Sequence, residues 1–436
     1  MSKLRILAVP SDNHGVGKYR ILDPYKFIGN NFSEEVHTDI VFDVEDNDDF
    51  FLNYDAVVFH SFIHKAPFER NVQRIEWLKS KGIKVIMDID DMWAVDQRHP
   101  MYEQIKATKL PEKKVQMLRL VDYVTCTTEY FANVIKERLG LRTNVFVFPN
   151  AVDENEPQFK SNPIPSDRLR FGWLGGSSHL HDLDMLKSGI HTIQNQFLDK
   201  TQFVLCGFDL RGQVSEINKQ TGEIRKRDIL PHETVWSKYE KIFTNDYKSL
   251  SPEYSKFLLT FKDEKYSDEN EPYRRRWTQE ISRYANNYNY FDVSLAPLVE
   301  SMFNACKSQL KIIEAGFHKK PIIAILPGSR KQEISKMLSV MLSVSGDFPD
   351  YQFVIAGAPS QEFSFYEPFL KEKNITDSPF DNQIKEAIQI FADRVRTDGQ
   401  SKEDLAKSKT VAQKPTVYFA PALLLRKRNT RSFTAL

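Results

Sequence analysis

The sequence predicts an α/β protein with two domains, each built around a parallel β-sheet, and a further segment at its C-terminal end. Residues 1–153 alternate short apolar runs with helical patterns, and a second alternation of the same kind begins at residue 168. Between them, residues 154–167 are polar and contain three prolines, which is typical of a linker. The 436 residues of the chain are also too many for one ordinary hydrophobic core.

The first domain, residues 1–153, contains six apolar or β-branched runs that we interpret as strands. Continuous apolar strands separated by helices are typical of a parallel sheet covered on both faces. Helical patterns occupy residues 68–82 and 129–140, and Gly140 is placed to cap the second helix. Open α/β sheets bind ligands at the carboxyl ends of their strands, so polar residues there are candidates for a site. The six runs are LRILAVP, DIVFDV, DAVVFH, IKVIMDI, YVTCT and NVFVFP.

A glycine turn, SDNHGVGKYRI, follows the first of these strands at residues 11–21. Gly15 and Gly17 allow the backbone to approach a ligand closely, and the amide groups of such a turn can meet an anion. The turn lacks the third glycine of a dinucleotide fingerprint and has no matching ribose-binding acid. A purely structural glycine turn therefore stays open as the alternative.

The second domain, residues 168–325, begins with the strand RLRFGWLGG, a helix and the strand TQFVLCG. Gly175, Gly176 and Ser177 precede that helix, whose N-terminus favours negative charge, so we expect this loop to bind a nucleoside diphosphate. Residues from about 211 to 289 are polar and rich in tyrosine, and we interpret them as a mainly helical insertion. The strand FDVSLAPL then restores the sheet.

Residues 293–324 are predicted to form a strand, a polar loop, a helix and a second strand. On the predicted helix, Lys307, Lys311, Glu314 and His318 fall at i, i+4, i+7 and i+11 and would share one face. Two ammonium groups and a carboxylate suit a ligand that carries phosphates and sugar hydroxyls. An amphipathic helix with a solvated polar face is the alternative.

This last segment resembles the donor-binding block of nucleotide-sugar glycosyltransferases of the GT-B architecture, in the retaining group 1 branch. The shared runs are Leu-Ala-Pro-Leu, Phe-Asn-x-x-Lys-Ser and Lys-x-x-Glu-Ala. The resemblance implies two Rossmann-like domains that face each other across a cleft, with an additional α/β or helical C-terminal tail. Relatives carry a glutamate eight residues before the equivalent of Glu314, whereas Cys306 stands there in this chain.

The resemblance also implies roles for individual residues. Glu314 would hold hydroxyls of the donor, and Lys307 would lie near its diphosphate, with Lys311 beside them. The glycine turn at residues 11–21 would face the cleft, where Arg20 would offer a planar fork to a phosphate or carboxylate. Relatives retain the anomeric configuration and need no metal.

Strand-end residues of the first domain complete the expected site. Asp90 and Asp91 invite a metal-binding interpretation, but no histidine or further carboxylate follows at ligand spacing, so no metal is expected. Together with His60, they are expected to lie on the side of the acceptor. Capping of a helix by Asp91 is the competing interpretation.

A second, shorter resemblance begins where the first one ends. Residues 323–357 repeat the plan of residues 171–207, and LPGSRKQEI and FPDYQFVIAGAPS resemble lipid A disaccharide synthase, an inverting GT-B enzyme, over about residues 320–370. From about residue 379 the chain follows neither family. We therefore predict that residues 326–436 are an extra tail with a chimeric origin.

Composition restricts the possible partners and location. A net charge of +1 gives no general attraction to nucleic acid. Three widely spaced cysteines suit a reducing cytoplasm, and no apolar run approaches the ~18 residues that would span a membrane. We expect a cytoplasmic protein and leave open a peripheral contact with the inner face of the membrane.

These observations lead to a glycosyltransferase hypothesis. The protein would move a sugar from a nucleoside diphosphate sugar, its co-substrate, to a hydroxyl of a glycan, a lipid or another precursor of surface polysaccharide, with no further cofactor. A non-catalytic nucleotide-sugar-binding protein or a remnant fusion is the main alternative. An NAD-dependent oxidoreductase is a third possibility, although its fingerprint is incomplete.

Overall fold

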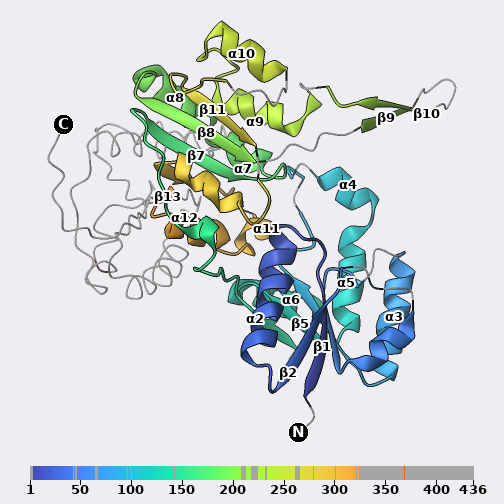
Figure 1. Cartoon of the computed structure of the whole chain (residues 1–436). Helices are drawn as coiled ribbons and strands as arrows, with labels where there is room; N and C mark the ends of the chain where they lie inside the picture. Colours follow the sequence, from blue (N-terminus) through green and yellow to red (C-terminus); the bar gives the residue numbers. More distant parts are fainter. Residues whose placement is uncertain are drawn as a thin grey trace. The chain divides into compact units, whose positions relative to one another are not determined.

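The computed structural model has a mixed α/β fold with two parallel sheets, which confirms the predicted fold class (Figure 1). It divides into two compact units at residue 157, within the predicted linker. The first unit comprises Met1–Pro157, Glu280–Tyr284 and Ser301–Glu314, and the second Gln158–Gln279, Ala285–Glu300 and Ala315–Leu436. The structure describes residues 3–323, except 43, 45–46, 64–66, 96, 100, 141–143, 208–212, 218–223, 231–232, 261–265, 278, 300 and 321, together with residue 368.

The first unit contains a six-stranded, fully parallel sheet of order β2-β1-β3-β4-β5-β6. All six predicted strands are present. The second strand begins and ends earlier than predicted, because β1 pairs residues Leu4 to Ala8 with residues Val36 to Ile40. The strands are β1 Leu4–Val9, β2 Val36–Ile40, β3 Ala56–His60, β4 Lys84–Ile89, β5 Tyr123–Cys126 and β6 Val145–Val147.

Helices connect the strands of this sheet and bury their apolar faces against it. In α6, the side chain of Thr128 accepts a hydrogen bond from the amide of Phe131, and Gly140 ends the helix at a φ of 66°, as predicted. After β1 the chain forms one turn of α-helix, a π-helical segment η1 and a longer α-helix. The helices are α1 Gly15–Gly17, η1 Lys18–Leu22, α2 Asp23–Asn31, η2 Asp48–Asn53, α3 Phe68–Ser80, α4 Tyr102–Ala107, α5 Leu110–Leu120 and α6 Glu129–Leu139.

The second unit contains a five-stranded parallel sheet of order β11-β8-β7-β12-β13 and a separate antiparallel pair, β9-β10. Within the five-stranded sheet, β7 and β8 pair from Leu169–Thr201 to Gly175–Gly207. The strands are β7 Leu169–Gly175, β8 Thr201–Gly207, β9 Gln213–Ile217, β10 Ile224–Asp228, β11 Tyr273–Trp277, β12 Val293–Leu295 and β13 Ile322–Ile323.

The helix predicted after β7 is divided into two. Leu183 lies in α7, Ile190 and Ile193 lie in α8, and Leu186 lies in the connection between the two helices. All four side chains are buried in the core, as predicted. The helices and 3-10 segments of this unit are η3 Pro157–Phe159, α7 Leu180–Asp184, α8 Lys187–Phe197, α9 Val235–Phe243, α10 Pro252–Leu259 and η5 Tyr284–Tyr290.

The expected helical insertion contains both helices and strands. Its run of three arginines, Arg274 to Arg276, lies on the edge strand β11 and not on a helix. The fork of Arg275 binds the buried carboxylate of Glu240 at 2.7 Å through two nitrogens, and Arg274 pairs with Asp268 at 2.6 Å. Successive side chains of a strand point to opposite faces of the sheet. The strand can therefore hold this basic run, because carboxylates neutralise the arginines.

The single helix predicted to carry Lys307 and Glu314 is also divided. It consists of α11 Met302–Ala305 and α12 Leu310–Phe317. Lys307 lies in the connection between them, so the predicted common face of four polar residues is wrong. The side chain of Ser301 caps α11, and the amide of Lys307 bonds to the carbonyl of Asn304, which closes that helix one turn after it starts.

Residues 324–436, apart from residue 368, lie outside the described part of the chain. The predicted extra tail, and with it almost all of the resemblance to lipid A disaccharide synthase, falls there and stays a prediction. Among the residues that are described, no helix is long and apolar enough to cross a membrane.

Candidate functional site

Each of the two parallel sheets has a topological switch point, where the strand order changes direction. The loops that follow the two strands at this point run to opposite faces of the sheet. In the first unit this place lies between β1, which is followed by residues 11–17, and β3, which ends at His60. In the second unit it lies between β7 and β12, whose following loops carry residues 176–179 and 296–299. Open parallel sheets bind ligands at such places, at the carboxyl ends of the strands.

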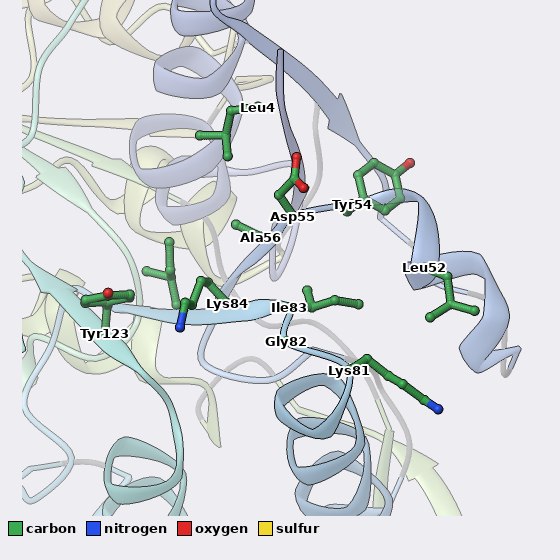
Figure 2. A pocket seen from close by; sticks show the side chains of 11 residues that line it. Leu4, Leu52, Tyr54, Asp55, Ala56, Lys81, Gly82, Ile83, Lys84 and Tyr123 are labelled. Atoms are coloured by element: carbon green, nitrogen blue, oxygen red, sulfur yellow. The ribbon is translucent and has the colours of Figure 1, made fainter. Parts of the chain in front are cut away.

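A cavity of about 610 Å³ lies at the other edge of the first sheet (Figure 2). It is lined by residues from the amino ends of the strands, among them Leu4 of β1, Ala56 of β3, Lys84 of β4 and Tyr123 of β5. Because parallel strands all start at this edge, the cavity is far from the loops that carry the predicted site residues. It is therefore not the predicted site.

The glycine turn of the first unit is filled by the chain's own carboxylate. Asp12 Oδ1 accepts hydrogen bonds from the amides of His14 at 2.8 Å and Gly17 at 3.2 Å. A Cβ atom at Gly17 would lie 1.8 Å from the carbonyl oxygen of Asp12, whereas a Cβ at Gly15 would meet nothing within 4 Å. Gly17 is thus required by the turn itself, and an external anion would have to displace Asp12 from its amide.

Arg20 already has anionic and carbonyl partners in the buried interior of the first unit. Its Nε and Nη2 donate to the two carboxylate oxygens of Asp88 at 2.9 and 2.6 Å, and Nη1 donates to the carbonyl of Phe148 and to Asn150 Oδ1. The exposed fraction of Arg20 is 1%. The guanidinium group of Arg20 therefore links β4 to the segment after β6. The expectation that this group binds a substrate anion does not fit this arrangement.

His60 and Asp90 form a pair at the carboxyl ends of β3 and β4. Asp90 Oδ1 lies 2.9 Å from His60 Nε2, and Ser11 Oγ lies 2.9 Å from His60 Nδ1. The hydroxyl of Ser11 donates its one proton to Asp12 at 2.8 Å, so it can only accept from His60. Both ring nitrogens of His60 therefore donate, and the hydrogen-bond partners assign an imidazolium.

The pKa shifts agree with this assignment. Burial by itself would lower the pKa of His60 and raise that of Asp90, but the hydrogen bond and the charge attraction between them outweigh burial. The pKa of His60 is therefore raised and that of Asp90 is lowered. Both shifts favour the charged forms of the two groups at this edge of the sheet.

Lys307 and Asp91 meet at the same edge of the first sheet. The distance between Lys307 Nζ and Asp91 Oδ1 is 3.4 Å, and the ammonium lies 4.6 Å from the ring centre of Phe303. Ser308, the next residue, accepts a 2.7 Å hydrogen bond from Asn150. The segment that carries the glycosyltransferase-like motifs is thereby fixed against strand ends β4 and β6.

Glu314 is buried in the first unit, with an exposed fraction of 2%. The hydroxyl of Tyr19 donates a 2.7 Å hydrogen bond to its Oε1. Burial and the nearby charge of Glu314 raise the pKa of Tyr19, so the phenol keeps its proton and remains a donor. Lys311, one turn earlier on α12, is half-buried.

Cys306 occupies the position where the relatives carry their first glutamate. Its side chain is fully buried in the core of the first unit, and burial raises the pKa of its thiol to about 12. It packs as a small apolar residue and cannot supply the missing carboxylate. The other two cysteines, Cys126 and Cys206, are likewise buried and free.

In the second unit, Tyr239 makes two hydrogen bonds to the backbone at the Gly175-Gly176-Ser177 loop. The hydroxyl of Tyr239 donates to the carbonyl of Gly176 at 3.2 Å and accepts from the amide of His179 at 2.8 Å. A Cβ at Gly207 would lie 2.0 Å from the carbonyl of Gly175, so the ends of β7 and β8 approach closely at this loop. The helix that follows, α7, is much shorter than predicted, which reduces the dipole expected at its start.

The contacts that fix the predicted residues were not visible in the sequence. Asp88, Tyr19 and Tyr239 carry no local signal for their roles, because their partners lie 68, 295 and 63 positions away. Asp182 has one weak signal, its i+3 spacing from His179. Within the described ranges, no group of three histidine, cysteine or acidic side chains is placed to hold a metal ion.

No protein-family model matches the chain, and neither does the sequence of any curated protein. Solved structures resemble it at low identity. TarM is 11% identical with a TM-score of 0.38, over 81% of this chain and 54% of TarM. The S. aureus MnaA–UDP structure is 8% identical with a TM-score of 0.40, over 95% and 99% of the two chains. The apo form of the lipopolysaccharide outer core galactosyltransferase WaaB is 10% identical with a TM-score of 0.40, over 91% and 100%. The chain thus spans about half the length of TarM.

Proposed function

We propose that this protein is a glycosyltransferase that moves a sugar from a nucleoside diphosphate sugar to a hydroxyl of an acceptor. The observation that carries the proposal is the position of the segment Ser301–Glu314, which contains the motif FNACKS and the first four residues of KIIEA. Lys307 contacts Asp91 after β4, and Ser308 contacts Asn150 after β6. A cation suited to a diphosphate therefore lies at the edge where parallel sheets bind ligands.

In this reaction, the bond between the anomeric carbon and the diphosphate oxygen breaks, and its electron pair stays on the diphosphate. The acceptor oxygen forms the new bond to the anomeric carbon, and its proton passes to an oxygen of the leaving diphosphate. Negative charge grows on the leaving diphosphate, and Lys307 is assigned to stabilise it electrostatically. Glu314, held by Tyr19, is assigned to orient hydroxyls of the donor. The co-substrate is the nucleoside diphosphate sugar, and no further cofactor is proposed.

The Gly175-Gly176-Ser177 loop of the second unit is also assigned to the diphosphate. Backbone amides and a serine hydroxyl are suitable donors to phosphate oxygens, and Tyr239 already holds the loop in place. A loop fixed before binding loses little entropy when the ligand arrives.

The acceptor side is assigned to His60, Asp90 and Asp91. Charged groups that hydrogen-bond to hydroxyls suit a glycan or a lipid with a sugar headgroup. Following the resemblance in the sequence, we propose a retaining outcome and no metal requirement. Following the composition, we propose a cytoplasmic location, with peripheral contact at the inner face of the membrane left open.

The decisive experiment incubates the full chain with labelled UDP- and GDP-sugars and a mixture of glycan and lipid acceptors. Mass spectrometry should detect a product heavier by one sugar residue, with release of the nucleoside diphosphate. The anomeric configuration by NMR tests retention, and an unchanged rate in a chelator tests metal independence. Binding of NAD by calorimetry without binding of UDP or GDP would instead support an oxidoreductase.

A non-catalytic nucleotide-sugar-binding protein is the second candidate, and two observations favour it. Cys306 stands where relatives carry a carboxylate, and the glycine turn is filled by Asp12. Binding of UDP or GDP without transfer or hydrolysis for any donor would select this candidate.

A further inference from the structure

Lys320 is a buried lysine at the amino edge of the second sheet, the edge opposite the Gly175-Gly176-Ser177 loop. Its exposed fraction is 4%, and it lies two residues before Ile322, which pairs with Ser294. Among the residues that the structure describes, none accepts a hydrogen bond from its amine or forms an ion pair with it. Buried lysines are almost always paired, so an unpaired one indicates a further interaction.

The neighbouring strands hold a buried ion pair at the same edge. Arg170, the second residue of β7, donates from Nε and Nη2 to the two carboxylate oxygens of Asp292 at 3.0 and 2.9 Å. Asp292 directly precedes β12, the strand between β7 and β13. Lys320, Asp292 and Arg170 therefore lie at the amino ends of three adjacent strands.

One donor of this ion pair is left over. Arg170 is 2% exposed, and its Nη1 is buried without a hydrogen-bond partner in the described part of the chain. A buried charged group with an unmade hydrogen bond is costly. Nη1 of Arg170 is therefore suited to a further anionic acceptor, and both oxygens of Asp292 are already in use.

The charges around Lys320 favour a neutral amine. Burial lowers its pKa to about 8, because the attraction of Asp292 is weaker than the cost of burying the ammonium, and the repulsion of Arg170 adds to that cost. His318 is the other titratable group that interacts with this amine, and burial lowers its own pKa to about 4. A sizeable fraction of Lys320 is therefore the neutral, nucleophilic amine in mildly alkaline solution.

We propose that Lys320 is a carbamylation site, at which the amine combines reversibly with CO2 and the resulting carbamate accepts a hydrogen bond from Nη1 of Arg170. The lone pair of Nζ forms the new N–C bond, and the π electron pair of one C=O bond moves to its oxygen. One proton passes from the nitrogen to solvent. The carbamate supplies the acceptor that Arg170 lacks, whereas an ammonium at the same place repels it.

The size and charge of CO2 suit this place. The molecule is small and neutral, so it can reach a nearly buried amine without carrying a charge into the interior. The side chain of Asp292 is 34% exposed, so solvent reaches this edge of the sheet and can take up the released proton. The modification does not depend on the proposed glycosyl transfer, because its residues lie at the other edge of the sheet.

The test incubates the full chain with isotopically labelled CO2, at a fixed concentration of the dissolved gas, at pH 7 and pH 8.5. Triethyloxonium then traps carbamates by ethylating their oxygen. Mass spectrometry of peptides from a protease that does not cut at lysine locates each labelled ethoxycarbonyl group. Lys320→Met removes the amine, and Lys319→Met is the matched control, because Lys319 is the adjacent residue and is exposed.

We expect the label on Lys320 of the wild type, with a higher occupancy at pH 8.5 than at pH 7, because the neutral amine reacts. Lys320→Met should lose this label, and Lys319→Met should keep it. Arg170→Gln, if circular dichroism shows that it folds, should lower the occupancy roughly 10- to 100-fold, the size of one charge-assisted hydrogen bond.

Absence of label on Lys320 in the wild type would overturn the inference, and so would equal labelling of Lys319 and Lys320. Full occupancy in a folded Arg170→Gln would contradict the contact with Arg170. The wild-type measurement decides by itself if a variant folds poorly. It uses no sugar donor or acceptor, so its failure would leave the proposed glycosyl transfer as it stands.

Discussion

The hydroxyl of Tyr19 donates a 2.7 Å hydrogen bond to the carboxylate of Glu314, although 295 positions separate them in the chain. Both side chains are buried in the first unit, with Tyr19 3% and Glu314 2% exposed. Tyr19 reaches this position from the π-helical segment η1, in which Lys18 to Ile21 are all buried. π-helical turns are rare and frequently occur at functional sites. The glutamate assigned to the donor is thus oriented by the segment that follows the first strand.

Tyr19→Phe should lower both stability and donor affinity. The variant removes one donor from a buried carboxylate, and we expect a loss of about 1–3 kcal/mol in the free energy of unfolding. The KM for the donor should rise, because Glu314 is then held less firmly. Denaturant titration and initial rates measure the two effects. Tyr130→Phe is the control, since that hydroxyl is exposed and makes only a 3.5 Å contact to Met302; a similar loss there would contradict the special role of Tyr19.

Lys307→Ala should reduce the rate of transfer by about 10²- to 10³-fold, the usual loss when one preorganised charge donor is removed from a transition state. Stability should change little, because the 3.4 Å contact with Asp91 is partly exposed to solvent. Lys84→Ala provides the comparison, because Lys84 is exposed at the amino edge of the same sheet. A full rate in Lys307→Ala, with intact folding by circular dichroism, would falsify the assignment of Lys307 to the diphosphate.

The His60–Asp90 pair should make stability depend on pH in a defined window. In the folded protein the pKa of His60 lies above its ordinary 6.5, and that of Asp90 lies below its ordinary 3.8. The contribution of His60 is therefore complete below pH 6.5 and is lost as pH rises through its raised pKa. The contribution of Asp90 is present above pH 3.8 and is lost as pH falls through its lowered pKa.

His60→Gln should accordingly destabilise the protein most between about pH 4 and 6.5, by about 1–3 kcal/mol, and less in alkaline solution. Urea titrations at pH 5, 7 and 9 measure the difference between variant and wild type. A difference that is constant over this range would mean that the ring is neutral in the folded state, and the imidazolium assignment would then be wrong.

Two glycines of one turn should respond differently to alanine. Gly17→Ala places a Cβ atom 1.8 Å from the carbonyl oxygen of Asp12, so the backbone of the turn must move. We expect a loss of about 1–3 kcal/mol or more in the free energy of unfolding. Gly15→Ala meets nothing within 4 Å and should be nearly neutral. Thermal unfolding of the two variants makes the comparison, and equal effects would show that the turn does not constrain Gly17 in this way.

Local patterns predicted local structure well. Every strand predicted in residues 1–153 is present, and the helix that begins after Thr128 ends at Gly140 as expected. Such signals depend on near neighbours: apolar runs for buried strands, a hydroxyl for a helix start and a glycine for a left-handed helix end. The predictions failed where a distant partner decides the structure. Arg274 to Arg276 fall in the insertion that was predicted to be mainly helical, but β8 pairs with them and Glu240 neutralises Arg275.

The candidate site was likewise predicted only in part from the sequence. The sequence identified His60 and Asp90 as candidates from residue type and position at strand ends, and Lys307 and Glu314 from helical spacing and from the family resemblance. It did not reveal that Arg20 is bound by Asp88, or that Asp12 fills the glycine turn. The first contact joins residues 68 positions apart, and the second depends on how the backbone folds in the turn after β1.

The amino-acid sequence by itself determined the alternation of strands and helices in both units, because each element is encoded by neighbours a few residues apart. Only the tertiary structure decided which unit receives the segment with Lys307 and Glu314. That segment packs with the first unit, where Phe303 and Cys306 enter the core and Tyr19, Asp91 and Asn150 bind its polar groups. The free energy of these contacts comes from partners 158 to 295 positions away, and no local pattern records such distances.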